Sequence, residues 1–142
     1  LWCQLVWFRL WNDERMRRVF VIDDSPLVRS MLRTMLGSVL PDGQLVSLNN
    51  GLEAMARIEK DGEPDLMLVD INMPEMDGLE FLQALRARGV LDRVPVIIVS
   101  TEQTPQDIAR GLAAGARAYL GKPFDAKQLR AAIEKGMDQK NG

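Results

Sequence analysis

The segment DLMLVDINMPEMDG, residues 65–78, begins with a short apolar run that ends at an aspartate, Asp70. Its Val and Leu residues follow one another without polar alternation, a pattern typical of a strand that is buried on both faces. Four other runs have the same character and are separated by longer segments. The five predicted strands are Arg18–Ile22, Gln44–Leu48, Asp65–Val69, Val94–Val99 and Ala116–Leu120.

Helical patterns separate these runs. The clearest covers Pro26–Leu40, where apolar residues recur at the three- and four-residue spacing of one helix face, after Ser25 as a cap and Pro26 at the first position. The other predicted helices are Leu52–Lys60, Leu79–Arg88, one from Thr104 through Leu112, and one after Asp125 through Met137. Five βα units in alternation predict an α/β fold, with a five-stranded parallel sheet, helices on both faces and right-handed crossovers.

Composition narrows the chemistry that this fold could carry. The 142 residues suit about one domain, and a net charge of −2 argues against a basic nucleic-acid binder. The chain has no histidine and a single cysteine, Cys3, so zinc sites of the Cys/His kind and Ser-His-Asp or Cys-His nucleophiles are excluded. The side chains that remain for any chemistry are carboxylates, hydroxyls and lysine, together with a metal that prefers oxygen ligands.

The two ends of the chain differ from the rest. Nine of the eleven residues in Leu1–Trp11 are apolar, but the run is too short for a membrane span, which needs about 20 residues, and it lacks the features of a signal peptide. We interpret residues 1–15 as an extension outside a domain of residues 16–142; a packing arm and a membrane contact are alternatives. The short polar tail after Lys135 favours a stand-alone protein.

Polar residues follow the predicted strands, where parallel α/β sheets collect their chemistry. They are Asp23-Asp24, Asp70, Ser100-Thr101 and Lys122-Pro123, while Asn49-Asn50 is typical of a turn. A single aspartate here would more often be a helix cap or a surface turn. Three carboxylates at one edge repel one another, and a divalent cation such as Mg²⁺ removes that cost.

Lysine and serine at the same edge indicate the reaction class. Lys122 can neutralise anionic oxygens and the Ser100 hydroxyl can donate to one of them, an arrangement suited to a phosphoryl group. Asp70 lies between the acidic pair and the Ser100 and Lys122 positions in the expected layout. We therefore predict that Asp70 is a nucleophile that becomes an aspartyl phosphate.

The segments VFVIDDSP, LMLVDINMPEMDG, PVIIVST and AYLGKPF resemble the marker segments of the response-regulator receiver domain. The resemblance runs from about Arg17 to Met137 and is closest in type to CheY-like single-domain regulators. It implies a flavodoxin-like (βα)5 fold with strand order 2-1-3-4-5. It also implies a phosphorylation-activated signalling module, not an enzyme, which takes its phosphoryl group from the phosphohistidine of a histidine kinase or phosphotransfer domain.

The resemblance also implies a role for each site residue. Asp70 is the phosphoacceptor, and Mg²⁺ is bound by Asp24, Asp70 and the backbone carbonyl of Asn72, with Asp23 acting through water. Lys122 assists the reaction and precedes a cis peptide bond to Pro123. Ser100 is the switch hydroxyl, and Tyr119 is the switch aromatic, although a tyrosine there could equally be an ordinary core residue.

Two positions depart from the commonest family pattern. Ser100 stands where threonine is more usual, which keeps the hydroxyl, and Thr101 stands where a small residue is frequent. Thr101, Asn72 and Glu102 are therefore expected to modulate access to the phosphoryl group. A downstream target is expected at the face of the fourth helix, fifth strand and fifth helix, with the candidates Gln106, Arg110 and Tyr119.

The resemblance further implies a cytoplasmic protein, with chemotaxis as a candidate process and with neither nucleic acid nor membrane as a partner. Two alternatives stay open. The first is a receiver detached from a larger transcriptional or enzymatic regulator. The second is a Mg²⁺-dependent phosphatase, whose Asp-x-Asp-x-Thr pattern differs from the adjacent Asp23 and Asp24.

Overall fold

The computed structural model describes residues 18–37 and 44–140. The predicted extension, residues 1–15, and the predicted end of the first helix, residues 38–40, lie outside the described residues. The five strands are β1 (Val19–Ile22), β2 (Leu45–Leu48), β3 (Leu66–Val69), β4 (Val96–Ser100) and β5 (Ala118–Gly121). All neighbours pair in parallel in the order β2-β1-β3-β4-β5, which confirms the predicted sheet.

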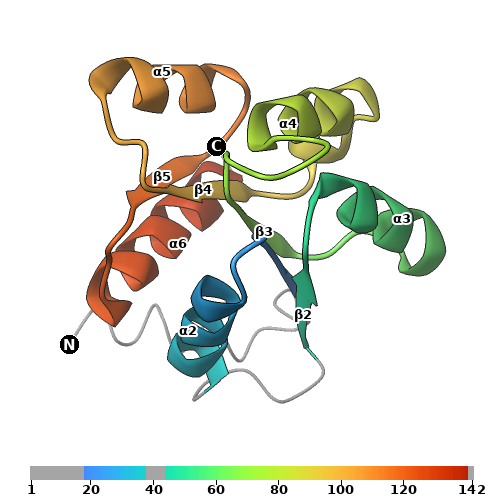
Figure 1. Cartoon of the computed structure of the whole chain (residues 1–142). Helices are drawn as coiled ribbons and strands as arrows, with labels where there is room; N and C mark the ends of the chain where they lie inside the picture. Colours follow the sequence, from blue (N-terminus) through green and yellow to red (C-terminus); the bar gives the residue numbers. More distant parts are fainter. Residues whose placement is uncertain (1–17, 38–43, 141–142) are drawn as a thin grey trace.

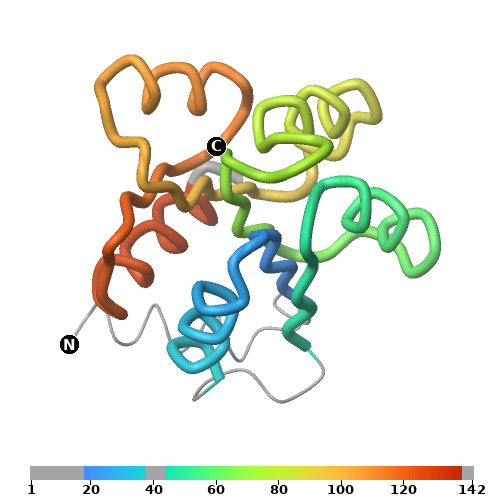
Figure 2. The backbone as a smooth tube through the Cα atoms, viewed as in Figure 1, coloured from blue at the N-terminus to red at the C-terminus, as the bar shows by residue number. Residues whose placement is uncertain are grey.

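Helices cover both faces of this sheet, as predicted (Figure 1). They are α2 (Pro26–Gly37), α3 (Gly51–Asp61), α4 (Gly78–Ala87), α5 (Pro105–Ala113) and α6 (Ala126–Lys140). The backbone tube shows α2 and α6 on one side of the sheet and α3, α4 and α5 on the other (Figure 2). Within the described part of the chain, no helix has the length and apolarity that crossing a membrane requires.

The alternation of side chains along the strands divides the core into two layers. Val19 and Val21 of β1 pack with Leu32 of α2 and Ile133 of α6. Phe20 and its neighbours on the opposite side pack with α3 and α4. The three central strands, β1, β3 and β4, are buried along their whole length, which explains their nearly continuous apolar sequences.

The caps at the starts of the helices explain where the loops end. Ser25 Oγ accepts the Val28 N–H at 3.3 Å, and Thr104 and Asp125 cap α5 and α6, all as predicted. Asn50, which the sequence suggested as a turn residue, caps α3 by accepting the Glu53 N–H at 2.9 Å.

Some element boundaries differ from the predicted ones. Strand β4 begins at Val96, not Val94, because Pro95 has no N–H to add to the ladder, and it extends to Ser100. A short 3-10 turn, Val90–Asp92, precedes it and was not predicted. Strand β5 begins two residues later than expected, after Gly115 turns the chain with a φ of 121°.

Candidate functional site

The predicted site residues meet at the carboxyl edge of the sheet. Asp23 follows β1, Asp70 follows β3, Ser100 ends β4 and Lys122 follows β5. Since β1, β3, β4 and β5 are neighbours in one parallel sheet, residues far apart in sequence become adjacent there. This edge is the only place in the described part of the chain where three acidic side chains are grouped closely enough to hold a metal ion.

The acidic cluster consists of Asp23, Asp24 and Asp70. One oxygen from each carboxylate lies within 4.8 Å of the other two. Asp23 and Asp70 are buried, with 2% and 6% of their surface exposed, whereas Asp24 is exposed. The cluster therefore has two fixed carboxylates at its base and one at its mouth, so a cation could enter from solvent.

Lys122 places a positive charge beside this cluster. Its Nζ lies 2.8 Å from Asp23 Oδ2 and 3.5 Å from Asp70 Oδ2. The second oxygen of Asp23 accepts the Ser25 N–H at 2.8 Å, so both of its oxygens are engaged. One ammonium group thus serves two buried carboxylates, which leaves the cluster with an excess of negative charge.

Burial raises the pKa of the Asp70 carboxyl to about 6, and the negative charge of Asp23 contributes to the rise. Lys122 and the Asn72 N–H, which lies 3.4 Å from Asp70 Oδ1, act in the opposite direction without cancelling it. Without a metal ion, the ionised Asp70 carboxylate therefore lies in an environment with too little positive charge. A divalent cation bound by oxygen ligands would supply that charge, so the residues present fit such an ion.

An arginine that the sequence analysis missed supports the loop after β1. The Arg29 guanidinium donates to the Asp23 backbone carbonyl at 2.7 Å and to Asn49 Oδ1 at 2.5 Å. It thereby links α2 to the loops after β1 and β2. The sequence did show a basic residue one turn into the helix that follows the acidic pair. The spacing of apolar residues along that helix, however, predicts that such a residue faces solvent.

Two loops at the mouth of the site are joined by side chains. Asn72 Nδ2 donates to Glu102 Oε1 at 3.1 Å, which connects the loop after β3 with the loop after β4. The buried Ser100 hydroxyl oxygen accepts the Glu102 N–H at 3.1 Å. Thr101 is exposed and lines a hollow of about 280 Å³ with Lys122 and apolar residues of α2 and the segment after β5.

Tyr119 on β5 packs against the core and also contacts the loop after β4. Its ring packs against the core beside Gly111, where a Cβ would lie 3.1 Å from the ring. Its hydroxyl donates to the backbone carbonyl of Glu102. Burial raises the pKa of this phenol. Of the other predicted surface residues, Gln106 and Arg110 are exposed on α5, and Arg110 is 3.3 Å from Asp107.

The peptide bond between Lys122 and Pro123 is cis, as the resemblance implied. The Lys122 N–H donates to the Ser100 carbonyl at 2.8 Å, and Gln103 Nε2 donates to the Lys122 carbonyl at 2.7 Å. These bonds connect the lysine segment to the loop after β4. All residues predicted at the strand ends are thus at one edge of the sheet.

A doubly wound parallel sheet that carries three aspartates and a lysine at its carboxyl edge is the architecture of a phosphoacceptor signalling domain. The chain belongs to the response regulator receiver domain family, whose model matches residues 19–134. Members of this family are phosphoacceptor modules rather than enzymes of the classical kind, and histidine kinases are their partners. The match gives no support to the phosphatase alternative.

The chain covers about half of some relatives and nearly all of others. The chain is 37% identical to response regulator MprA of Mycobacterium leprae over 82% of its length and 49% of that protein. It is 34% identical to two-component response regulator ORR1 of Oryza sativa subsp. japonica, covering 79% of this chain and 52% of ORR1. Chemotaxis protein CheY1 of Helicobacter pylori is 29% identical over 82% of this chain and 94% of CheY1. The chain therefore spans about half the length of MprA and ORR1.

The chain is also similar to solved structures, of which it covers either nearly the whole or about half. Vibrio cholerae chemotaxis protein CheY4 matches with a TM-score of 0.74 and 30% identity, over 85% of this chain and 98% of CheY4. A putative two-component response regulator/GGDEF domain protein matches with a TM-score of 0.84 and 26% identity, over 98% of this chain and 56% of that one.

Proposed function

We propose that this protein accepts a phosphoryl group on Asp70 from the phosphohistidine of a histidine kinase or phosphotransfer domain, in a reaction that depends on Mg²⁺. The phosphorylated form then changes its affinity for a downstream target. The observation that carries this proposal is the position of Asp70, which is buried at the sheet edge among two further aspartates and 3.5 Å from the Lys122 ammonium.

Asp70 would act as the nucleophile. A carboxylate oxygen of Asp70 forms the new bond to phosphorus while the bond between phosphorus and the histidine nitrogen of the donor breaks. These 142 residues contain no histidine, so they cannot supply the phosphohistidine themselves. The Lys122 ammonium is close enough to neutralise charge on the phosphoryl oxygens after transfer.

The metal ligands in this proposal are Asp24, Asp70 and the backbone carbonyl of Asn72, with Asp23 acting through water. When bound, Mg²⁺ would supply positive charge to the phosphoryl oxygens and lower their repulsion with the carboxylates. The chain's own contribution is to hold Asp23 in place, through Lys122, the Ser25 N–H and the Arg29 contact with its backbone carbonyl.

The surface beside the site suits the approach of a protein donor. The hollow next to Lys122 is lined by Val28, Met31 and the Pro123-Phe124 pair, and Leu27 on the same helix is 70% exposed. Apolar surface of this kind, directly beside the reacting carboxylate, favours contact with another protein. Thr101 lies in the same hollow and would limit access to the phosphoryl group, as Asn72 and Glu102 would from the opposite loop.

Ser100 and Tyr119 would carry the response. In the structure both contact Glu102, Ser100 through its hydroxyl oxygen and Tyr119 through its hydroxyl group. A phosphoryl group that attracts the Ser100 hydroxyl would change the loop that Tyr119 holds. The proposed target surface is therefore the face of α5, β5 and α6, with Gln106, Arg110 and Tyr119.

The setting of the domain is also part of the proposal. We favour a CheY-like, cytoplasmic, stand-alone regulator, with chemotaxis as the candidate process and residues 1–15 outside the receiver domain; the extent of the match to CheY1 supports this. The second candidate is the receiver part of a larger regulator, which the half-length coverage of MprA and ORR1 favours.

The test is a titration of the full chain with beryllofluoride, which mimics a phosphoryl group on a carboxylate, followed by amide NMR. With Mg²⁺ present, we expect saturable shifts at Asp70, Ser100, Thr101 and Tyr119, and none in the Asp70→Asn variant. Equal shifts without Mg²⁺, or equal shifts in the variant, would contradict the proposal.

A further inference from the structure

A side chain that the sequence analysis did not single out connects the loop after β4 to the segment after β5. Gln103, in the loop between β4 and α5, donates from Nε2 to the backbone carbonyl of Lys122 at 2.7 Å. Gln103 is an exposed residue, yet its side chain lies over Gly121 of β5. The bond therefore joins two segments that both carry predicted site residues.

Gly121 makes this position of the glutamine possible. A Cβ at residue 121 would come within 3.0 Å of three side-chain atoms of Gln103, which are Cγ, Cδ and Oε1. Real Cβ atoms essentially never approach other atoms so closely, so a larger residue at this position would displace the amide. Because the displaced atoms belong to a flexible and exposed side chain, the strand itself could accept the change. Gln103 and Gly121 thus form a pair.

The amide of Gln103 completes the hydrogen bonding of the Lys122 backbone. Strand β4 pairs with β5 as far as Ser100, whose carbonyl then accepts the Lys122 N–H at 2.8 Å. Beyond this point Pro123 has no N–H, and the Glu102 N–H bonds to the Ser100 hydroxyl oxygen. The Lys122 carbonyl accepts from the Gln103 side chain instead. Both polar groups of the Lys122 backbone are therefore bonded to the end of β4 and the loop that follows it.

These bonds hold two sides of the site in place relative to each other. The ammonium of Lys122 lies 3.5 Å from Asp70 Oδ2, and the loop after β4 starts from Ser100. A phosphoryl group on Asp70 would need the ammonium for its charge and the Ser100 hydroxyl as a hydrogen-bond donor. A shift of about 1 Å between two such groups is enough to weaken their combined action. A bond between the two segments therefore matters for the chemistry.

We propose that Gln103 is a positioning residue for the site around Asp70. Through its bond to the Lys122 carbonyl, it holds the loop after β4 at the distance from which Lys122 and Ser100 both reach a phosphoryl group. This role rests on the proposed function and adds to it a residue that acts through Lys122 and the loop. Gly121 is the partner of Gln103, because it leaves the space in which the amide lies.

The experiment measures the affinity of the full chain for beryllofluoride in saturating Mg²⁺ by amide NMR. Gln103→Met is uncharged and of similar length but has no donor, and it should weaken this affinity about fivefold, the contribution of one neutral hydrogen bond. Gln103→Ala should have the same effect. Gly121→Ala should match it too, because the new Cβ displaces the amide. The Gln103→Ala/Gly121→Ala double variant should be no weaker than either single one, whereas independent losses would multiply to about twenty-five-fold.

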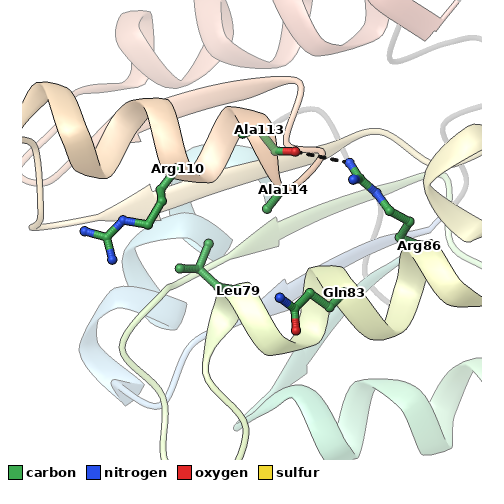
Figure 3. Close-up of a pocket in the computed structure, with 6 residues that line it drawn as sticks. All are labelled: Leu79, Gln83, Arg86, Arg110, Ala113 and Ala114. Carbon is green, nitrogen blue, oxygen red and sulfur yellow. Dashed lines mark hydrogen bonds between the residues drawn. The ribbon is translucent and has the colours of Figure 1, made fainter.

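Affinity for Mg²⁺ alone separates positioning from general damage to the site. It should equal that of the parent in every variant, because no proposed metal ligand is changed. Two matched controls should keep the parent's affinity for beryllofluoride. Gln83→Ala replaces another exposed glutamine, on α4 (Figure 3). Gly37→Ala replaces a glycine at the end of α2, where an added Cβ would meet nothing within 4 Å.

Three outcomes would overturn this role while leaving the proposed function in place. They are parent affinity for beryllofluoride in Gln103→Met, losses that multiply in the double variant, and an equal loss of affinity for Mg²⁺ alone. The proposed function fails in a different measurement, on the parent. Absence of saturable, Asp70-dependent shifts in the parent chain would overturn the proposed function and, with it, the role of Gln103.

Discussion

The ammonium of Lys122 lies 2.8 Å from the carboxylate of Asp23, with the two side chains 13% and 3% exposed. The contact joins the loops after β1 and β5, which are 99 residues apart in sequence. Its buried position means that removal of either partner leaves an uncompensated charge, and such losses cost about 3 kcal/mol or more.

Lys122→Ala should therefore lower the free energy of unfolding of the metal-free protein by about 3 kcal/mol. Added Mg²⁺ should restore part of the loss, because the cation replaces the missing positive charge. Urea unfolding with EDTA and with Mg²⁺ measures both values. Equal destabilisation under the two conditions would show that Lys122 and the metal do not share the same carboxylates.

Asp70→Asn should abolish phosphorylation by acetyl phosphate while the fold survives. The substitution has nearly the same shape and removes the nucleophilic oxygen. Incorporation of labelled phosphate is the measurement, and circular dichroism checks the fold. The control is Asp65→Asn, at an aspartate on the opposite edge of the sheet, before β3; it should incorporate phosphate like the parent. Undiminished label in Asp70→Asn would place the nucleophile elsewhere.

The raised pKa of Asp70 predicts a pH dependence of stability without metal. Because the folded-state pKa, about 6, exceeds the ordinary value of 3.8, folding favours the protonated form. This stabilisation is complete below about pH 4 and is lost as the pH rises through 6. The gain in unfolding free energy from Asp70→Asn should therefore be larger at pH 7.5 than at pH 4, by about 3 kcal/mol at most.

Denaturant unfolding of both proteins in EDTA at the two pH values gives this difference directly. Titration of the other carboxylates is common to parent and variant, so it cancels in the comparison to first order. A gain that is the same at pH 4 and pH 7.5 would contradict the raised pKa.

Asp24→Asn should raise the melting temperature of the metal-free protein and weaken Mg²⁺ binding. Asp24 is exposed, so the gain in stability should be small, on the order of 0.5 kcal/mol. Calorimetry in EDTA and a Mg²⁺ titration measure the two effects. Unchanged Mg²⁺ affinity would remove Asp24 from the proposed ligands.

A chain that starts at Met16 should keep the melting temperature, the Mg²⁺ affinity and the phosphorylation rate of the full chain. The five strands of the described sheet all lie within residues 19–121. The three tryptophans of Leu1–Trp11 would add apolar surface, so the full chain should self-associate more, as light scattering can show. A fall of several degrees on truncation would mean that the segment packs on the domain.

The strands and the residues at the edge of the sheet could be anticipated because strand ends follow directly from where apolar runs stop. Asp70 lies directly after four buried residues, and parallel pairing then places it beside Asp23. The family resemblance added the strand order, which periodicity alone does not determine.

Contacts made by long side chains could not be anticipated in the same way. Arg29 reaches the Asp23 carbonyl and Asn49 because of its rotamer and the angle at which α2 leaves the sheet. The hollow of about 320 Å³ between α4 and α5 depends on the distance between these two helices (Figure 3). The sequence contains two alanines there, Ala113 and Ala114, but it does not reveal how far apart the helices lie. The shared contact of Ser100 and Tyr119 with Glu102 is likewise a product of loop geometry.

Tyr119 is the single tyrosine of the chain, and its hydroxyl bonds to the loop that also holds Ser100. Biosynthetic replacement of tyrosine by fluorotyrosine would therefore give one fluorine resonance, with no need for assignment. That resonance would report the state of this hydrogen bond in real time, even inside intact cells. The protein thus carries a built-in spectroscopic reporter at the point where its conformational response is expected.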